Sequence, residues 1–240
     1  VRRCLGVRVE MVRAFAGEVD GLVGVWFEGG MLKGDVLECM RDWRDLEEMR
    51  VVLPLASLGD EVFEYLRCWD LRHLELGYCK FLSDEGIAPV TSLTNLVSLD
   101  LKGCYKITDD GLSYLQYMTQ LTYLDISSFK EITDSGCENL VPLTNLKYLA
   151  LGSPNITNIS LQYITKLSNL KYLYIGGCHI DDNSFFHLKN LEHLKTVNIG
   201  KFSSSATFMT YIPDETHNIY KIIQSDTTHM KNQIKTDFPI

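Results

Sequence analysis

A repeat of 24 or 25 residues constrains the fold of this chain more than any other feature of its sequence. Segments of the form LxxLxL, in which Val, Met, Ile or Phe replaces some of the leucines, recur along the chain. Their first residues are Leu22, Leu46, Leu71, Leu96, Leu121, Leu146, Leu170 and Leu194. Each step between these leucines is 24 or 25 residues. Eight units in register over residues 22–218 predict one continuous repeat architecture.

The apolar spacing changes within each unit. Residues 96–101 carry leucines at the spacing of a short strand, whereas Leu112, Leu115 and Met118 recur at the three-residue step of one helical face. The expected helix starts carry side-chain oxygens that can cap free amides. These are Ser83-Asp84, Thr108-Asp109, Thr133-Asp134, Thr157-Asn158 and Asp181-Asp182. Each unit is therefore predicted as strand, loop and helix, and it can bury its apolar face only by stacking on its neighbours.

The best-preserved unit, LVSLDLKGCYKITDDGLSYLQYMTQL at residues 96–121, resembles the cysteine-containing class of leucine-rich repeats. The resemblance implies an α/β fold, an open right-handed solenoid or horseshoe with a parallel concave sheet and convex helices. Proteins of this class are mostly F-box substrate receptors of ubiquitin ligases and their relatives. The resemblance thus implies a protein-protein interaction scaffold, the substrate-recognition part of a cullin-type ligase receptor. The alternative is a free-standing binding protein of the effector or inhibitor type with no ubiquitin link.

The cysteines follow the family pattern only in part. The cysteine column reads Gly30, Pro54, Cys79, Cys104, Phe129, Pro154, Cys178 and Phe202. Cys68 and Cys137 also fall in core columns of the repeat, whereas Cys4 and Cys39 do not. We expect the cysteines in these columns to be small buried apolar groups without a redox or nucleophilic role.

The flanks of the repeat are less regular. Residues 1–21 are expected to form a partial repeat or an N-terminal flank, too short for an F-box, and the chain begins with Val1 rather than Met. Ile219 and Ile222 repeat the 25-residue step from Leu194 and Val197. Residues 22–218 are therefore expected to form the solenoid, and residues 219–240 a degenerate C-terminal cap or a tail.

The amino-acid composition limits the kinds of partner that the chain is expected to bind. The net charge is -8, from 23 basic and 31 acidic residues without a basic block, which argues against a nucleic-acid partner. The absence of an apolar run of membrane length, or of an export signal, favours a cytoplasmic or nucleocytoplasmic protein. The seven cysteines include no CxxC pair, so no metal or cofactor is expected.

The candidate binding site lies on the concave sheet. The third and fifth residues of each LxxLxL segment are expected to project from it, because strand side chains alternate. Two columns result: Tyr123, Tyr148 and Tyr172, joined by Tyr174, and beside them Glu75, Asp100 and Asp125. Aromatic residues often anchor interfaces, so we expect these seven residues to bind a basic or extended segment of a protein partner. A simpler interpretation is that the tyrosines pack on the sheet and the carboxylates are solvated.

Catalysis has little support in the sequence. Motifs of hydrolases, metalloproteases and nucleotide-binding enzymes are missing. His73 and Glu75 could form an acid/base pair on one strand, but no nucleophile accompanies them. The sequence predicts that the chain is not an enzyme.

Overall fold

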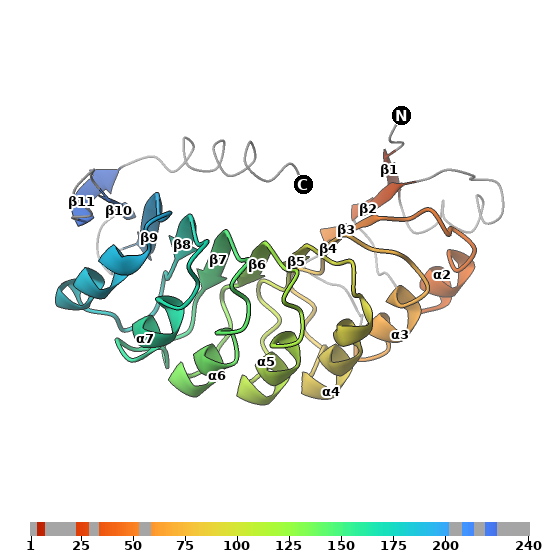
Figure 1. Cartoon of the computed structure of the whole chain (residues 1–240). Helices are drawn as coiled ribbons and strands as arrows, with labels where there is room; N and C mark the ends of the chain where they lie inside the picture. The colour runs from red at the N-terminus through yellow and green to blue at the C-terminus, as the bar shows by residue number, and fades with distance from the viewer. Residues whose placement is uncertain are drawn as a thin grey trace.

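A computed structural model describes residues 4–7, 23–28, 34–52, 59–201, 208–213 and 219–224. Its strands form one sheet of 11 strands in sequence order. Strands β1 to β9 run parallel. They are β1 (Cys4–Val7), β2 (Gly24–Glu28), β3 (Glu48–Val52), β4 (His73–Glu75), β5 (Ser98–Asp100), β6 (Tyr123–Ile126), β7 (Tyr148–Leu151), β8 (Tyr172–Tyr174) and β9 (Thr196–Lys201). The open, curved, parallel sheet confirms the predicted solenoid (Figure 1).

The strand register follows the leucine spacing. Strands β2 to β9 begin at the third residue of each LxxLxL segment, and equivalent residues pair across every step. Leu99, for example, pairs with Leu74 on one side and Leu124 on the other, and all three are buried. A slip of one residue would turn these leucines out of the core, so the apolar pattern fixes the register.

Short helices return the chain along the outer, convex side of the curve (Figure 1). They are α2 (Gly34–Cys39), α3 (Val62–Leu66), α4 (Asp84–Ile87), α5 (Asp109–Leu115), α6 (Asp134–Glu138) and α7 (Ser160–Ile164). The described residues also include two 3-10 helices, η1 (Ala88–Ser92) and η2 (Asp182–Asn190). Leu112 and Leu115 of α5 are fully buried. The core therefore lies between the sheet and the helices and runs the length of the solenoid.

Hydrogen bonds join the helix starts of successive units. Thr108 and Thr133 cap their own helices as predicted, each hydroxyl accepting from the N–H two residues on. The following aspartate reaches forward instead. Asp109 Oδ1 accepts from the Thr133 N–H at 2.9 Å, and its Oδ2 accepts from the Thr133 hydroxyl at 2.6 Å. Equivalent pairs join Asp60 to Ser83, Asp84 to Thr108 and Asp134 to Thr157. We call this series the Asp–Thr ladder.

Two units carry the motif TDxG, in which the ladder residues Thr and Asp are followed two positions later by Gly111 or Gly136. This glycine makes room for the ladder. A Cβ at Gly136 would lie 2.1 Å from Asp109 Oδ1, and one at Gly111 would lie 2.3 Å from Asp84 Oδ1. The next unit has Ser160 at the equivalent position, and its helix begins at Ser160 itself, two residues later in the motif than α6 at Asp134. The motif therefore encodes contact between units as well as a helix start.

One step of the ladder exchanges its residue types. Asp181 stands where the other units have Ser or Thr, and its carboxylate has no proton to donate. The preceding unit carries Asn158 instead of Asp, and the Asn158 amide donates to Asp181 Oδ2 at 2.6 Å. In return the Asp181 N–H donates to Asn158 Oδ1 at 2.9 Å. The exchange keeps two hydrogen bonds and avoids two opposed carboxylates.

The cysteine predictions are confirmed in part. Cys79, Cys104 and Cys137 are buried and free, whereas Cys178 is half-buried. The assignment of Cys68 to the core is wrong, because its side chain is exposed. The stretch between helix and strand is one residue shorter here, so Trp69 occupies the core position and its Nε1–H donates to the Met40 carbonyl at 3.2 Å.

The C-terminal end of the sheet changes direction. β10 (Phe208–Pro213) pairs antiparallel with β9, and β11 (Ile219–Gln224) pairs antiparallel with β10. Ile219 therefore does not continue the parallel repeat, although its spacing matches. Residues 225–240 lie outside the described residues. That this end covers the solenoid core stays a prediction.

Candidate functional site on the concave face

The tyrosine column forms as predicted. Tyr123, Tyr148 and Tyr172 pair in register on β6, β7 and β8. The Tyr123 and Tyr148 rings stack with centroids 4.3 Å apart and planes at 4°. The Lys195 ammonium lies 5.7 Å from the centroid of the Tyr172 ring. The column is thus a row of aromatic rings in which Tyr123 stacks on Tyr148 and a cation lies near the ring of Tyr172.

The tyrosines are more covered than the sequence suggests. Tyr123 is 9% exposed and Tyr172 is 3% exposed, so little of either side chain is accessible to solvent on the concave face. Neighbouring side chains on adjacent strands cover one another because each strand places the same bulky residue in the same row. Tyr148 and Tyr174 are half-buried and remain accessible.

Tyr174 belongs to the second column. It pairs with Ala150 on β7 and Asn198 on β9. Its hydroxyl and ring occupy the space beside Gly176, where a Cβ would lie 2.2 Å from the hydroxyl oxygen. The small residues Ala150 and Gly176 therefore make room for the ring of Tyr174 at this end of the carboxylate column.

The carboxylate column also forms as predicted, with Glu75, Asp100 and Asp125 paired in register on β4, β5 and β6. Each aspartate also shapes its own strand end. Asp100 Oδ1 accepts from the Lys102 N–H at 2.8 Å, and Asp125 Oδ1 accepts from the Ser127 N–H at 2.8 Å. These two side chains therefore turn the chain out of the strand in addition to presenting charge.

Burial and mutual repulsion weaken the charge of this column. Burial, followed by the neighbouring charges of Asp125 and Glu75, raises the pKa of Asp100 to about 7. Burial also raises the pKa of Asp125. The ammonium of Lys102 and hydrogen bonds from the backbone oppose these shifts without cancelling them. Near neutral pH the carboxyl group of Asp100 is therefore partly protonated.

The tyrosines stay protonated. Burial, aided by nearby acidic side chains, raises the pKa of Tyr123, Tyr148 and Tyr174 above the usual value. Their hydroxyls are thus neutral hydrogen-bonding groups over the physiological range.

The structure adds nothing to the acid/base hypothesis for His73 and Glu75. Both are half-buried residues of β4, separated by the buried Leu74. The cavity described below lies at the loops and includes neither residue. Among the described residues, no cluster of three His, Cys, Asp or Glu side chains could hold a metal ion.

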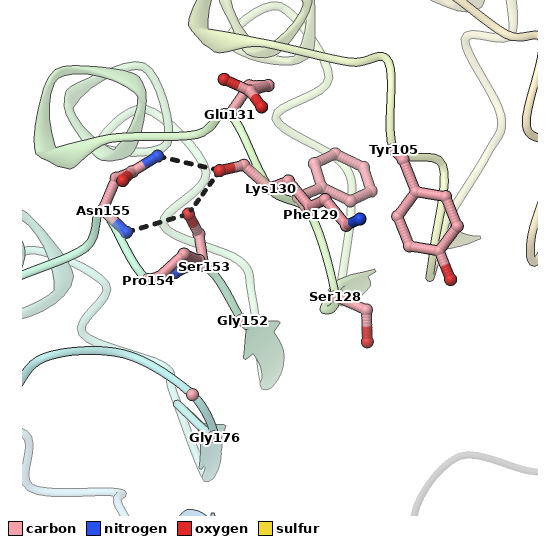
Figure 2. Close-up of a pocket in the computed structure, with 11 residues that line it drawn as sticks. Tyr105, Ser128, Phe129, Lys130, Glu131, Gly152, Ser153, Pro154, Asn155 and Gly176 are labelled. Carbon is pink, nitrogen blue, oxygen red and sulfur yellow. Dashed lines mark hydrogen bonds between the residues drawn. The ribbon is translucent and has the colours of Figure 1, made fainter.

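A cavity of about 680 Å³, which the sequence analysis missed, lies at the loops that follow β5 to β8. Tyr105, Phe129 and Lys130 line one side, and the backbone around Gly152 and Gly176 lines the other (Figure 2). The repeat length marks this place, because it changes from 25 to 24 residues after Leu146. The loop of the shorter units lacks one residue, which leaves the surface hollow.

Comparison with known proteins supports the fold. Residues 67–90 and 92–115 match the family model described as Leucine Rich repeat. The internalin inlF of Listeria monocytogenes is similar at 24% identity and a TM-score of 0.57, over 75% of this chain and 48% of that one. The TLR13–ssRNA13 complex is similar at 20% identity and a TM-score of 0.53, over 75% of this chain and 30% of that one. Together with the strand order of the structure, these matches show that the chain has the leucine-rich-repeat fold.

The comparisons reach no further than the fold. A third structure, internalin C2 of Listeria monocytogenes, is 20% identical with a TM-score of 0.46, over 79% of this chain and 65% of that one. This chain thus spans less than two thirds of the length of each of these structures. No curated protein matches the chain. Within the described residues, none of the helices has the length and apolar character needed to span a membrane.

Proposed function

We propose that this chain binds a basic, extended segment of a protein partner along its concave face. Leucine-rich-repeat proteins generally act in protein-protein interaction, and their fold typically serves as a non-enzymatic scaffold. The observation that carries the proposal is the aromatic row of Tyr148 and its neighbours beside the crowded carboxylates of Asp100 and Asp125. A protein rarely places like charges side by side in a buried row unless a partner relieves the repulsion.

A cationic segment would relieve that repulsion directly. Its Lys or Arg side chains would face Glu75 and Asp100, while its apolar side chains pack on Tyr148 and Tyr174. The added positive charge favours the ionised form of Asp100, so binding lowers the raised pKa and releases a proton. Affinity should therefore rise with pH through about 7.

The test measures the binding of a short fluorescein-labelled peptide of alternating Arg and Leu by fluorescence anisotropy. Tyr148→Ala and Tyr174→Ala should each weaken binding by about 1 to 3 kcal/mol. Tyr117→Ala is the matched control, because Tyr117 is 69% exposed and follows α5 on the convex side. Equal losses in the control and site variants, or tighter binding of an alternating Glu and Leu peptide, would contradict the proposal.

We propose further that the binding face serves as the substrate-recognition part of a cullin-type ubiquitin ligase receptor. The support is the repeat consensus of residues 96–121, together with Cys79 and Cys104 buried in the family's cysteine column. The alternative, a free-standing binding protein of the effector or inhibitor type, uses the same face without a ligase. Affinity purification of the natural full-length protein separates the two: co-purification of a cullin supports the first, and its absence supports the second.

A further inference from the structure

The loops that leave strands β4, β5 and β6 carry alternating lysine and aromatic side chains. The two residues after the cysteine column are Lys80-Phe81, Tyr105-Lys106 and Lys130-Glu131 in successive units. They stand at equivalent positions, because each pair lies between two buried residues of the repeat, such as Cys104 and Ile107. We call Lys80, Phe81, Tyr105, Lys106 and Lys130 the loop edge.

Each lysine of the second and third loops lies over a ring of the preceding loop. The Lys106 ammonium is 5.6 Å from the centroid of Phe81, and the Lys130 ammonium is 5.2 Å from the centroid of Tyr105. The step is the same in both pairs, so a cation and a ring alternate along the edge. Contact with a ring face holds each ammonium in place, because the electron-rich face attracts the charge.

The loop edge is open to a partner. All three lysines are exposed, and Phe81, at 56% exposed, is one of the most exposed large apolar side chains in the described part of the chain. None of the three lysines forms an ion pair with another residue that the structure describes. In a chain with a net charge of -8, three such lysines in successive loops form a local field opposite to that of the whole molecule.

The cavity of about 680 Å³ continues the loop edge. Tyr105, Phe129 and Lys130 line it, and the Ser153 hydroxyl and the Asn155 amide both donate to the Lys130 carbonyl, which fixes the wall (Figure 2). Its lining combines the aromatic residues Tyr105 and Phe129 with polar and charged groups such as Lys130, so it can hold a side chain whose apolar part meets the rings.

We infer that the loop edge binds a short acidic segment of a protein partner whose apolar or aromatic side chain enters this cavity. Carboxylates spaced along an extended segment pair with Lys80, Lys106 and Lys130, and the exposed ring of Phe81 is covered. This surface is separate from the concave face and opposite to it in charge. The chain therefore carries two docking surfaces, one for a basic segment and one for an acidic segment.

A single-stranded nucleic acid fits these observations less well. It carries one phosphate per nucleotide and would extend past three lysines. Glu131 ends the row, and the same three units carry Glu75, Asp100 and Asp125 on the neighbouring face.

The experiment is fluorescence anisotropy with a labelled peptide of alternating Glu and Asp that contains one central Phe. The triple variant Lys80→Gln, Lys106→Gln, Lys130→Gln should weaken binding at least about ten-fold, and added salt should weaken binding to the unchanged chain. The control variant Lys147→Gln, Lys166→Gln, Lys189→Gln removes three exposed lysines elsewhere and should leave the affinity unchanged. Replacing the central Phe of the peptide by Ser should also reduce affinity.

Three results would overturn the inference. One is equal binding by the triple variant and the unchanged chain, with both folded by circular dichroism. Another is an equal loss in the control variant, which would show attraction to net charge alone. The last is tighter, lysine-dependent binding of an oligouridylate of the same length, which would assign the loop edge to nucleic acid.

Discussion

Two series of carboxylates run along this solenoid with the same period, and their energetic effects are opposite. In the Asp–Thr ladder each carboxylate meets a hydroxyl and an N–H of the next unit, as Asp109 does with Thr133. On the concave face burial, followed by the charges of Asp125 and Glu75, raises the pKa of Asp100 to about 7. The same repeat spacing therefore produces a stabilising series where each carboxylate lies beside hydrogen-bond donors. It produces a destabilising series where each carboxylate lies beside other carboxylates.

The difference indicates which series was shaped for stability. The Asp–Thr ladder is accompanied by Gly111 and Gly136, whose missing Cβ atoms admit the carboxylates. On the concave face Asp100 and Asp125 each accept a backbone N–H from their own strand end and not from the next unit. Repulsion that persists in a folded protein is more typical of a binding surface than of a structural one.

The largest expected effect comes from breaking the ladder at its centre. Asp109→Ala removes two charge-assisted hydrogen bonds to Thr133 and should lower the free energy of unfolding by about 3 kcal/mol. The measurement is the urea unfolding curve. Asp110→Ala is the matched control, because Asp110 is an exposed acidic residue in the same helical turn. Equal small losses in both variants would show that the ladder contributes only helix-end charge.

The second effect tests the link between the ladder and its glycine. Gly136→Ala should lower the free energy of unfolding by about 2 kcal/mol, because the Cβ of the alanine would press against Asp109 Oδ1. In the Asp109→Ala background this cost should shrink, since the colliding group is gone. A double-mutant cycle of urea unfolding energies measures the coupling. Additive losses would mean that the glycine serves its own helix and not the contact between units.

The sequence predicted the repeat and its register because leucine spacing alone decides which side chains face the core. It failed at Cys68, where one missing residue moved Trp69 into the core position. It also predicted which tyrosines align, but not that Tyr123 and Tyr172 are buried. Burial and the raised pKa of Asp100 depend on what surrounds a residue in space, and a spacing pattern carries no such information.

The Asp–Thr ladder and the cavity could have been found from the sequence. Residues joined by the ladder are 23 or 24 positions apart, and Asn158 changes together with Asp181, so comparison of equivalent positions reveals the pairing. The change from 25-residue to 24-residue units after Leu146 similarly marks the shortened loops around the cavity. Both signals lie between units rather than within one.

A smaller effect should follow when the exchanged pair is turned into a pair of like charges. Asn158→Asp places two carboxylates opposite each other and should cost about 1.5 kcal/mol at pH 7. The folded state then raises one pKa, so the loss should disappear as the pH falls and that carboxyl is protonated. Urea unfolding at pH 7 and at an acidic pH measures the difference in the free energy of unfolding.

A rescue sharpens this result. Adding Asp181→Thr to Asn158→Asp recreates the Asp and Thr pair of the other units and should restore stability at pH 7. Threonine also keeps the cap of η2, where the Asp181 side chain accepts from the Ser184 N–H. Failure of the rescue, with the single variant still pH-dependent, would show that this unit holds the pair in a different geometry.

The smallest expected effect is a gain of stability on the concave face. Asp100→Asn keeps an oxygen that can accept from the Lys102 N–H but removes the charge that Asp125 and Glu75 repel. The folded pKa of Asp100 is about 7, above the value of about 4 in an unfolded chain, so its contribution to stability falls as pH rises from about 4 to 7. The free energy of unfolding of the variant should therefore exceed that of the original chain by about 1 kcal/mol at pH 8, and the two should be equal at pH 4. Glu192→Gln, at an exposed position, should show no such difference between the two pH values. If the stability gain of Asp100→Asn is likewise the same at pH 4 and pH 8, the concave carboxylates do not repel one another. The contrast with the Asp–Thr ladder then fails.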